Sequence, residues 1–184
     1  MSEEIQPQLA AVLGEYEVVT AAVRALAASV DDATFLRRPS PERWSAAECV
    51  EHLTLSNRLY YEMIRDGLAR ARLLPPHPGP HRRKLLGRLL AWSLEPGRGG
   101  KSRTIPSTVP HVAVAPQGVV GDFVESQRVI ASFVRESSGL DLRRIVVVSP
   151  FLKALKYDLY SLYTILAAHG RRHLRQAENA VRGA

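Results

Sequence analysis

The chain has 184 residues, of which 46% are hydrophobic and 23% are charged. This composition excludes full disorder, and the length favours one domain, residues 1–184, that contains a long insertion. No apolar run approaches the ~18–20 residues of a membrane span, and the polar, acidic start is unlike a signal peptide. The single cysteine excludes an internal disulfide and a cysteine-based metal cluster, so we expect a cytoplasmic protein with no membrane partner.

The net charge of +7 allows nucleic acid or an anionic ligand as a partner but establishes neither. The basic residues form short clusters, such as residues 82–84, without the interleaved aromatic side chains of a single-strand binder. No helix-turn-helix or RNA-binding motif is evident. We therefore interpret the positive charge as a solvated surface and expect no nucleic-acid partner.

The first half of the chain contains two predicted long helices. Apolar residues at three- and four-residue spacing predict the first helix over residues 5–30, and a proline-punctuated loop follows. Ser45 and Glu48 form a capping box that starts the second helix, which runs to about Arg72. Trp44 precedes this cap and is placed to pack against the first turn of the helix.

Residues 75–117 form a proline-rich, irregular connection that we expect to lie over one end of the molecule. Within it, residues 84–94 have the spacing of a short amphipathic helix. A third long helix is predicted from residue 117 or 121 to residue 137. The β-branched run at residues 145–148 is typical of a strand, but it has no evident partner, so we predict an extended segment over 140–148.

A fourth helix is predicted to start after Ser149 and Pro150, with its periodic part over residues 156–180. Four long helices with one long connection, between the second and third, indicate an all-α four-helix bundle. In the fourth helix, two series of residues seven apart share the core-facing stripe: Leu155, Leu162, His169 and Gln176, and Leu159, Leu166, His173 and Ala180.

Two histidines therefore occupy positions where leucine is expected. His169 and His173 are four residues apart, so they stack on one helical face and can chelate one ion. His52 in the second helix can point toward the interior beside them. Three imidazoles would leave one coordination position open, as in catalytic sites. The simpler alternative is that these are hydrogen-bonded core histidines without a metal.

Other residues are weaker candidates for this chemistry. Cys49 lies one turn before His52 and is either a soft ligand, a redox-sensitive thiol or a small packing residue. The remaining histidines lie in the proline-rich connection and are lesser candidates for ligands: His77, His81 and His111.

Two local motifs resemble those of one family. Residues 44–53, Trp-Ser-Ala-Ala-Glu-Cys-Val-Glu-His-Leu, resemble the Trp-Ser-x-x-Glu-x-x-x-His-Leu signature of the DinB/YfiT-like superfamily. Residues 150–152, Pro-Phe-Leu, followed by 168–176, Ala-His-Gly-Arg-Arg-His-Leu-Arg-Gln, are similar to its closing His-x-x-x-His-x-x-Gln motif. The order and separation of the two motifs also match.

The resemblance implies an up-down-down-up four-helix bundle with a divalent metal held by His52, His169 and His173. Zinc, nickel and iron are all found in the family, so the identity of the metal does not carry over. The resemblance also implies a homodimer. Characterised members include S-transferases and isomerases that use low-molecular-weight thiols, and some hydrolases.

The leading hypothesis is a metal-dependent enzyme that activates water or a low-molecular-weight thiol against a small-molecule substrate. Glu48 and Gln176 are each one helical turn from a histidine and could orient an imidazole. Asn57 and Tyr61 could line the pocket. The alternative is a non-catalytic stress-response protein that binds a metal or a small ligand, because no separate general base or nucleophile is evident in the sequence.

Overall fold

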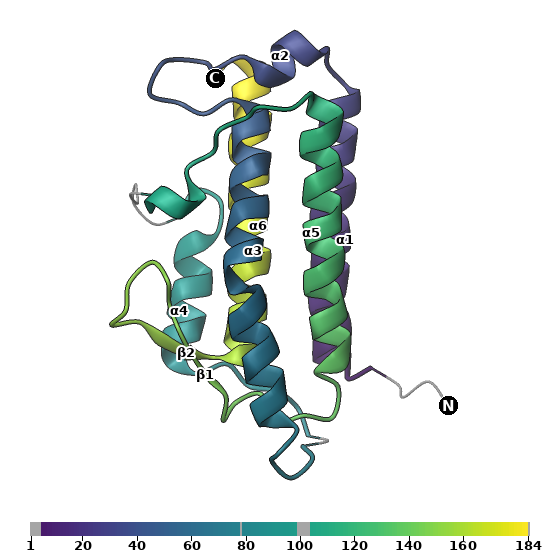
Figure 1. Ribbon diagram of the computed structural model, residues 1–184, viewed down its shortest axis with the longest axis vertical. Coiled ribbons are helices and arrows are strands. Elements are labelled where there is room, and N and C mark those ends of the chain that lie inside the picture. Colours follow the sequence, from purple (N-terminus) through teal and green to yellow (C-terminus); the bar gives the residue numbers. More distant parts are fainter. Residues whose placement is uncertain (1–4, 78, 99–103, 184) are drawn as a thin grey trace.

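Four long helices form an elongated bundle in the computed structural model, which describes residues 5–77, 79–98 and 104–183 (Figure 1). The elements in chain order are α1 (Pro7–Ala28), α2 (Asp32–Leu36), α3 (Ala46–Ala71), α4 (Leu85–Leu94), the 3-10 turn η1 (Pro106–Thr108), α5 (Pro116–Glu136), β1 (Val146–Val148), β2 (Lys156–Asp158) and α6 (Leu159–Arg182). The bundle helices α1, α3, α5 and α6 run up, down, down and up in Figure 1, which confirms the predicted all-α bundle. Within the described ranges, no helix has both the length and the apolar character that a membrane crossing requires.

The order of the helices around the bundle determines which residues meet. Both α3 and α1 pack against α5 and α6. Because α3 and α6 run in opposite directions, the first turns of α3 lie beside the second half of α6. This antiparallel pairing brings position 52 to the level of positions 169 and 173.

The bundle interior consists of two hydrophobic clusters. One occupies the first halves of α1 and α6 and the second halves of α3 and α5, and the other occupies the opposite halves together with α2. Buried polar side chains lie where the clusters meet. There the Asn57 amide of α3 donates hydrogen bonds to Ser126 Oγ (3.0 Å) and Gln127 Oε1 (3.1 Å) of α5. Hydrogen bonding compensates the cost of burying these polar groups in the core.

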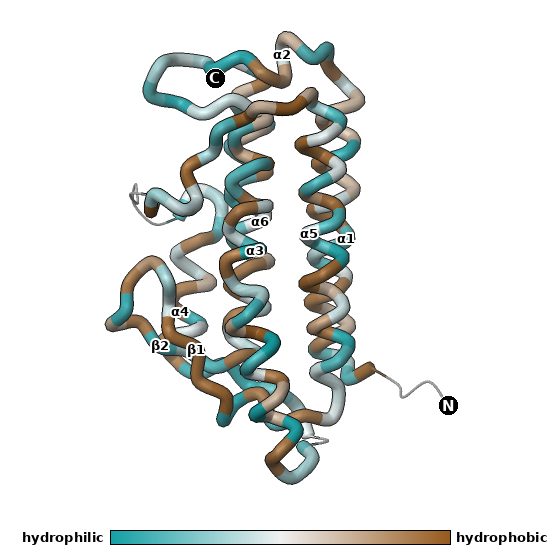
Figure 2. Tube along the Cα trace, viewed as in Figure 1, coloured by the Kyte–Doolittle hydropathy of each residue, from teal (hydrophilic) through white to brown (hydrophobic). Residues whose placement is uncertain are grey.

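The expectation that residues 145–148 have no partner strand is wrong. β1 pairs antiparallel with β2, with Val147 opposite Tyr157, and β1 is hydrophobic in Figure 2. The sequence predicts the fourth helix over the residues of β2, because the leucines at 155, 159 and 162 keep helical spacing. The hairpin shows that a short apolar run of this kind does not distinguish a strand from a helix.

The true start of α6 is determined by Asp158. Its buried carboxylate accepts hydrogen bonds from the backbone N–H and the hydroxyl of Ser161, as a helix N-cap does. The same carboxylate accepts a bond from the backbone N–H of Lys84, at the start of α4 (3.3 Å). One side chain therefore fixes the starts of two helices relative to each other.

In its described residues, the proline-rich connection is less irregular than expected, and its helical part lies along the side of the bundle and not over one end. The predicted short helix forms as α4 and packs along the side of α6 (Figure 1). The close approach requires a glycine, because a Cβ at position 87 would overlap with the Oγ and Cβ of Ser161. The short helix α2, which precedes the capping box, was not predicted. Asp31 caps it by accepting a hydrogen bond from the N–H of Thr34.

We predict that Gly87→Ala destabilises the protein by about 1–3 kcal/mol, because the added methyl group must push α4 away from α6. Urea unfolding followed by circular dichroism measures the change. Gly14→Ala in α1 is the matched control, since a Cβ there meets nothing within 4 Å. It is expected to stabilise α1 by up to about 1 kcal/mol. Equal responses of the two variants would contradict close packing at residue 87.

Candidate metal centre

Three histidine side chains from two helices converge inside the bundle. His52 comes from α3, and His169 and His173 come from α6, and one ring nitrogen of each lies within 4.8 Å of those of the other two. The Nε2 atoms of His52 and His169 are 3.3 Å apart. His52 and His173 are buried, and His169 is partly buried. The structure thus brings together the three histidines that the sequence selected.

A backbone carbonyl orients the His52 ring. The Nδ1 of His52 lies 2.7 Å from the carbonyl oxygen of Thr108, the last residue of η1. A carbonyl only accepts, so Nδ1 must carry the proton, and the Nε2 atom that faces His169 then holds a lone pair. This tautomer is the one that binds a metal through Nε2. Sequence reasoning missed Thr108, because a backbone carbonyl has no side-chain signature.

Burial keeps the three rings neutral. It lowers the pKa of His52, and it lowers the pKa of His169 to about 3, with His52 and Arg172 adding to the effect. Burial also places the pKa of His173 well below its usual value, reinforced by the two neighbouring histidines. Metal binding requires neutral imidazole, so no proton has to be displaced at neutral pH.

The donor set suits one divalent ion, and one pair of its nitrogens has the matching separation. Two nitrogens that each lie ~2.0–2.1 Å from a tetrahedral ion are about 3.3 Å apart, which is the separation of the two Nε2 atoms. The buried Nδ1 of His173 has no hydrogen-bond partner in the part of the chain that the structure describes. Such an unsatisfied buried atom calls for an explanation, and a bound ion or an associated water would supply one.

The histidines lie at the wall of a cavity of about 840 Å³ between α3, α6, α4 and the loop before β2. The end of α4 is held beside the histidines by the side chains of Arg171 and Arg172. Arg171 forms an ion pair with Glu95, and Arg172 donates to the carbonyl oxygens of Ser93 and Arg98. The cavity volume of about 840 Å³ is in the range of sites that bind small molecules.

Trp44 is a further wall residue that the sequence placed only as a packing residue before the cap. Its ring centroid lies 4.9 Å from that of His52 and 6.1 Å from that of His173. The indole also packs on the hydrophobic cluster at this end of the bundle, as a residue before a helix cap commonly does. Trp44 therefore contacts both the hydrophobic cluster at the start of α3 and the histidine rings.

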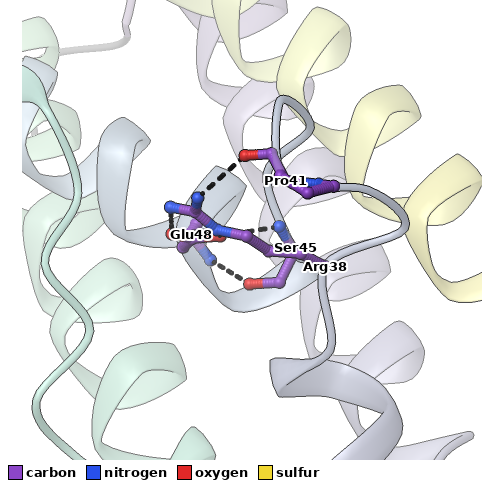
Figure 3. Close-up of polar contacts among 4 residues, drawn as sticks. All are labelled: Arg38, Pro41, Ser45 and Glu48. Carbon is purple, nitrogen blue, oxygen red and sulfur yellow. Dashed lines mark hydrogen bonds and ion pairs between the residues drawn. The ribbon is translucent and has the colours of Figure 1, made fainter.

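The start of α3 is fixed by a capping box that an arginine reinforces (Figure 3). Ser45 Oγ accepts from the Glu48 N–H, and the Glu48 carboxylate accepts from the Ser45 N–H and from the Arg38 guanidinium. Arg38 also donates to the carbonyl oxygen of Pro41. Burial alone would raise the pKa of Glu48, but the bonds from Arg38 and Ser45 outweigh it and the pKa is lowered. This network sets the position of α3 one turn before His52.

The other sequence candidates divide into two groups. Gln176 and Cys49 line the cavity. Burial raises the pKa of the Cys49 thiol to about 12, and a protonated thiol is a poor nucleophile. Asn57 and Tyr61 instead face α5, where Tyr61 donates to the Ser126 carbonyl oxygen. Together with Glu48, which is engaged in the cap, these two residues are absent from the described cavity wall.

The three histidines of the connection lie apart from this cluster. His81 is buried near the start of α1, where its Nε2 is 2.8 Å from Gln6 Oε1 and its ring stacks on Tyr160. The His77 ring lies 5.9 Å from that of His81. His111 is exposed in a segment without regular secondary structure. Among the described residues, only His52, His169 and His173 form a histidine cluster suited to a metal.

The chain is thus an up-down-down-up helical bundle with a cluster of three histidines, between α3 and α6, that could hold a metal ion. The model of the DinB superfamily matches residues 15–177, so the chain belongs to the DinB superfamily. Its structure is similar to that of YfiT from Bacillus subtilis, described as a probable metal-dependent hydrolase with an unusual four-helix bundle topology. The match has a TM-score of 0.63 at 16% identity and covers 98% of this chain and 90% of that one, which establishes the shared fold alone. None of the curated proteins matches the chain.

We predict that Glu48→Gln lowers the stability by about 1 kcal/mol at pH 7, because it removes the charge from the cap. The native carboxyl has a lowered pKa, so its contribution is present above about pH 5 and is lost as the pH falls through that pKa. Urea unfolding between pH 7 and pH 3 should therefore show a shallower acid loss in the variant. Glu17→Gln, at an exposed position, is the control. If its stability changes with pH as that of Glu48→Gln does, the cap is not the cause of the effect.

Proposed function

We propose that this protein is a metal-dependent enzyme that acts on a small molecule bound in the cavity of about 840 Å³. The observation that carries the proposal is the convergence of His52, His169 and His173 at the wall of that cavity. A metal that serves only stability would have its coordination closed by protein ligands. Here three candidate ligands face a space large enough for a small molecule.

The three imidazoles would hold one divalent ion, and zinc, nickel and iron all suit nitrogen ligands of this kind. When bound, such an ion supplies Lewis acidity and lowers the pKa of a water or thiol that reaches it. The Thr108 carbonyl keeps the His52 ring in the tautomer that presents Nε2. Trp44 covers the histidines on one side and limits the access of bulk water.

Hydrolysis is the first reaction class that we propose, and the description of the similar YfiT structure supports it. Transfer of a low-molecular-weight thiol is the second. Arg43 and Arg172 line the same cavity. Arg43 precedes Trp44, whose ring lies against those of His52 and His173, and Arg172 precedes His173 itself. Their positive charges favour an anionic substrate or an anionic thiol at this end.

The central test is metal binding. We expect purified protein to hold about one divalent ion per chain, and His169→Ala to weaken that binding by at least 100-fold, because the change removes one of three ligands. Elemental analysis after dialysis against zinc, nickel or ferrous iron measures the stoichiometry. His111→Ala, a change at an exposed histidine outside the cluster, is the control and should bind normally. Failure of the wild-type protein to bind any of these ions would exclude the proposal.

Turnover distinguishes an enzyme from a binding protein. Metal-loaded protein is assayed with a panel of esters, amides and lactones, and with thiols plus an electrophile. Activity that a chelator removes and that the bound metal restores is expected, and it should be absent from His169→Ala. Full metal binding without turnover on either panel would favour the alternative, a non-catalytic protein that binds a metal or a small ligand.

The proposal also includes a single domain and a homodimer. The continuous family match over residues 15–177 supports the single domain. The homodimer rests on the resemblance to the DinB family, and sedimentation equilibrium of the metal-loaded protein decides it.

A further inference from the structure

The cavity has a second polar region that the metal site does not use. Ser56 and Tyr60 follow His52 at intervals of four residues on α3, so the three side chains share one helical face. Tyr157 and Ser149 reach the same cavity from β2 and from the loop between β1 and β2. We call the part lined by Ser56, Tyr60, Ser149 and Tyr157 the hydroxyl end.

The hydroxyl groups of this region are buried. The Tyr60 and Tyr157 oxygens are 2.8 Å apart, so one hydroxyl donates to the other. Burial raises the pKa of both tyrosines, which keeps both hydroxyls protonated. Ser56 is fully buried, and its Oγ has no hydrogen-bond partner among the residues that the structure describes. A buried hydroxyl without a partner is costly unless a ligand or an ordered water satisfies it.

Charge is distributed unequally along the cavity. Among the described residues of its wall, the Asp, Glu, Lys and Arg side chains are those of Glu42, Arg43 and Arg172. These three residues are close in sequence to Trp44 and His173, at the opposite end from the tyrosine pair. The hydroxyl end therefore offers hydrogen bonds but no counter-charge.

The space between the two ends is apolar on the α6 side. Ile165 and Leu166 of α6 line the wall one turn before His169, and Leu155 closes it from the hairpin. A buried charged group in this space would have no ion pair to compensate its desolvation. An uncharged chain would lose nothing there and would gain from removing its apolar surface from water.

We propose that the hydroxyl end is a recognition subsite for an uncharged, hydrogen-bonding group of the substrate, such as an amide or ester carbonyl. Tyr60 is eight positions after His52, a rise of about 12 Å along the helix, and that rise sets the length of the substrate. The substrate class is an elongated molecule with its reacting group at the histidines, an apolar middle and a neutral polar terminus. The inference rests on the proposed function in taking the histidines as the reacting end.

Hydroxamates, which chelate divalent ions, provide the probe. Three eight-carbon hydroxamates differ only at the far terminus, which is a carboxamide, a methyl group or a carboxylate. Isothermal titration of the metal-loaded protein should show the carboxamide binding about tenfold more tightly than the other two. Ser56→Ala and Tyr60→Phe should each reduce this preference to about twofold, while acetohydroxamate, which has no chain, should bind all proteins equally.

Tyr163→Phe is the matched control. It also removes a buried tyrosine hydroxyl, but that hydroxyl bonds to Ser137 (2.9 Å) outside the described cavity wall. The preference for the carboxamide should persist in this variant. Equal affinities for the three termini, a preference for the carboxylate, or an unchanged preference in both Ser56→Ala and Tyr60→Phe would overturn the subsite.

A parallel measurement separates the subsite from the metal. Chelator-treated protein is titrated with octanamide and octanoate, which lack the chelating group, and binding is followed by NMR. If no hydroxamate binds metal-loaded protein but octanamide is preferred and Ser56→Ala removes the preference, the metal assignment fails and the subsite stands. If octanamide and octanoate bind alike, the subsite fails whatever the metal result.

Discussion

The antiparallel contact between α3 and α6 is the constraint on which the rest of the structure depends, because it places three imidazole rings inside a hydrophobic bundle. Burial of such groups is unfavourable unless each finds a partner. His52 obtains one from the Thr108 carbonyl, and its Nε2 faces that of His169. The structure around them is organised to hold this arrangement: a reinforced cap fixes α3, and the Asp158 carboxylate fixes α6 and α4 together.

The parts of the fold that follow from local chemistry could be predicted from the sequence. The capping box at Ser45 and Glu48 predicted the first residue of α3 correctly, because both partners of that interaction lie within one turn. Helical periodicity placed His169 and His173 on the interior stripe of α6 for the same reason. That His52 lies beside them was supported mainly by the family motif, because the pairing of two distant helices is not encoded in the spacing within either of them.

The features that escaped prediction depend on contacts between distant parts of the chain. The β1–β2 hairpin needs pairing across a loop, and the leucines around Lys156 fit helical spacing as well as they fit a strand. Asn57 was placed at the pocket by its position on α3, yet its amide is needed by Ser126 and Gln127 in the polar layer between the two hydrophobic clusters. Which face a polar residue serves is decided by its neighbours in space.

The bond from His52 to Thr108 has an evolutionary consequence. Every residue carries a backbone carbonyl, so substitutions along the connection between α3 and α5 can alter the shape and polarity of the cavity while the imidazole keeps its partner. A change in the length of this segment is different, because it would shift which carbonyl, if any, arrives at the ring. The segment can therefore diversify by replacement far more freely than by insertion or deletion.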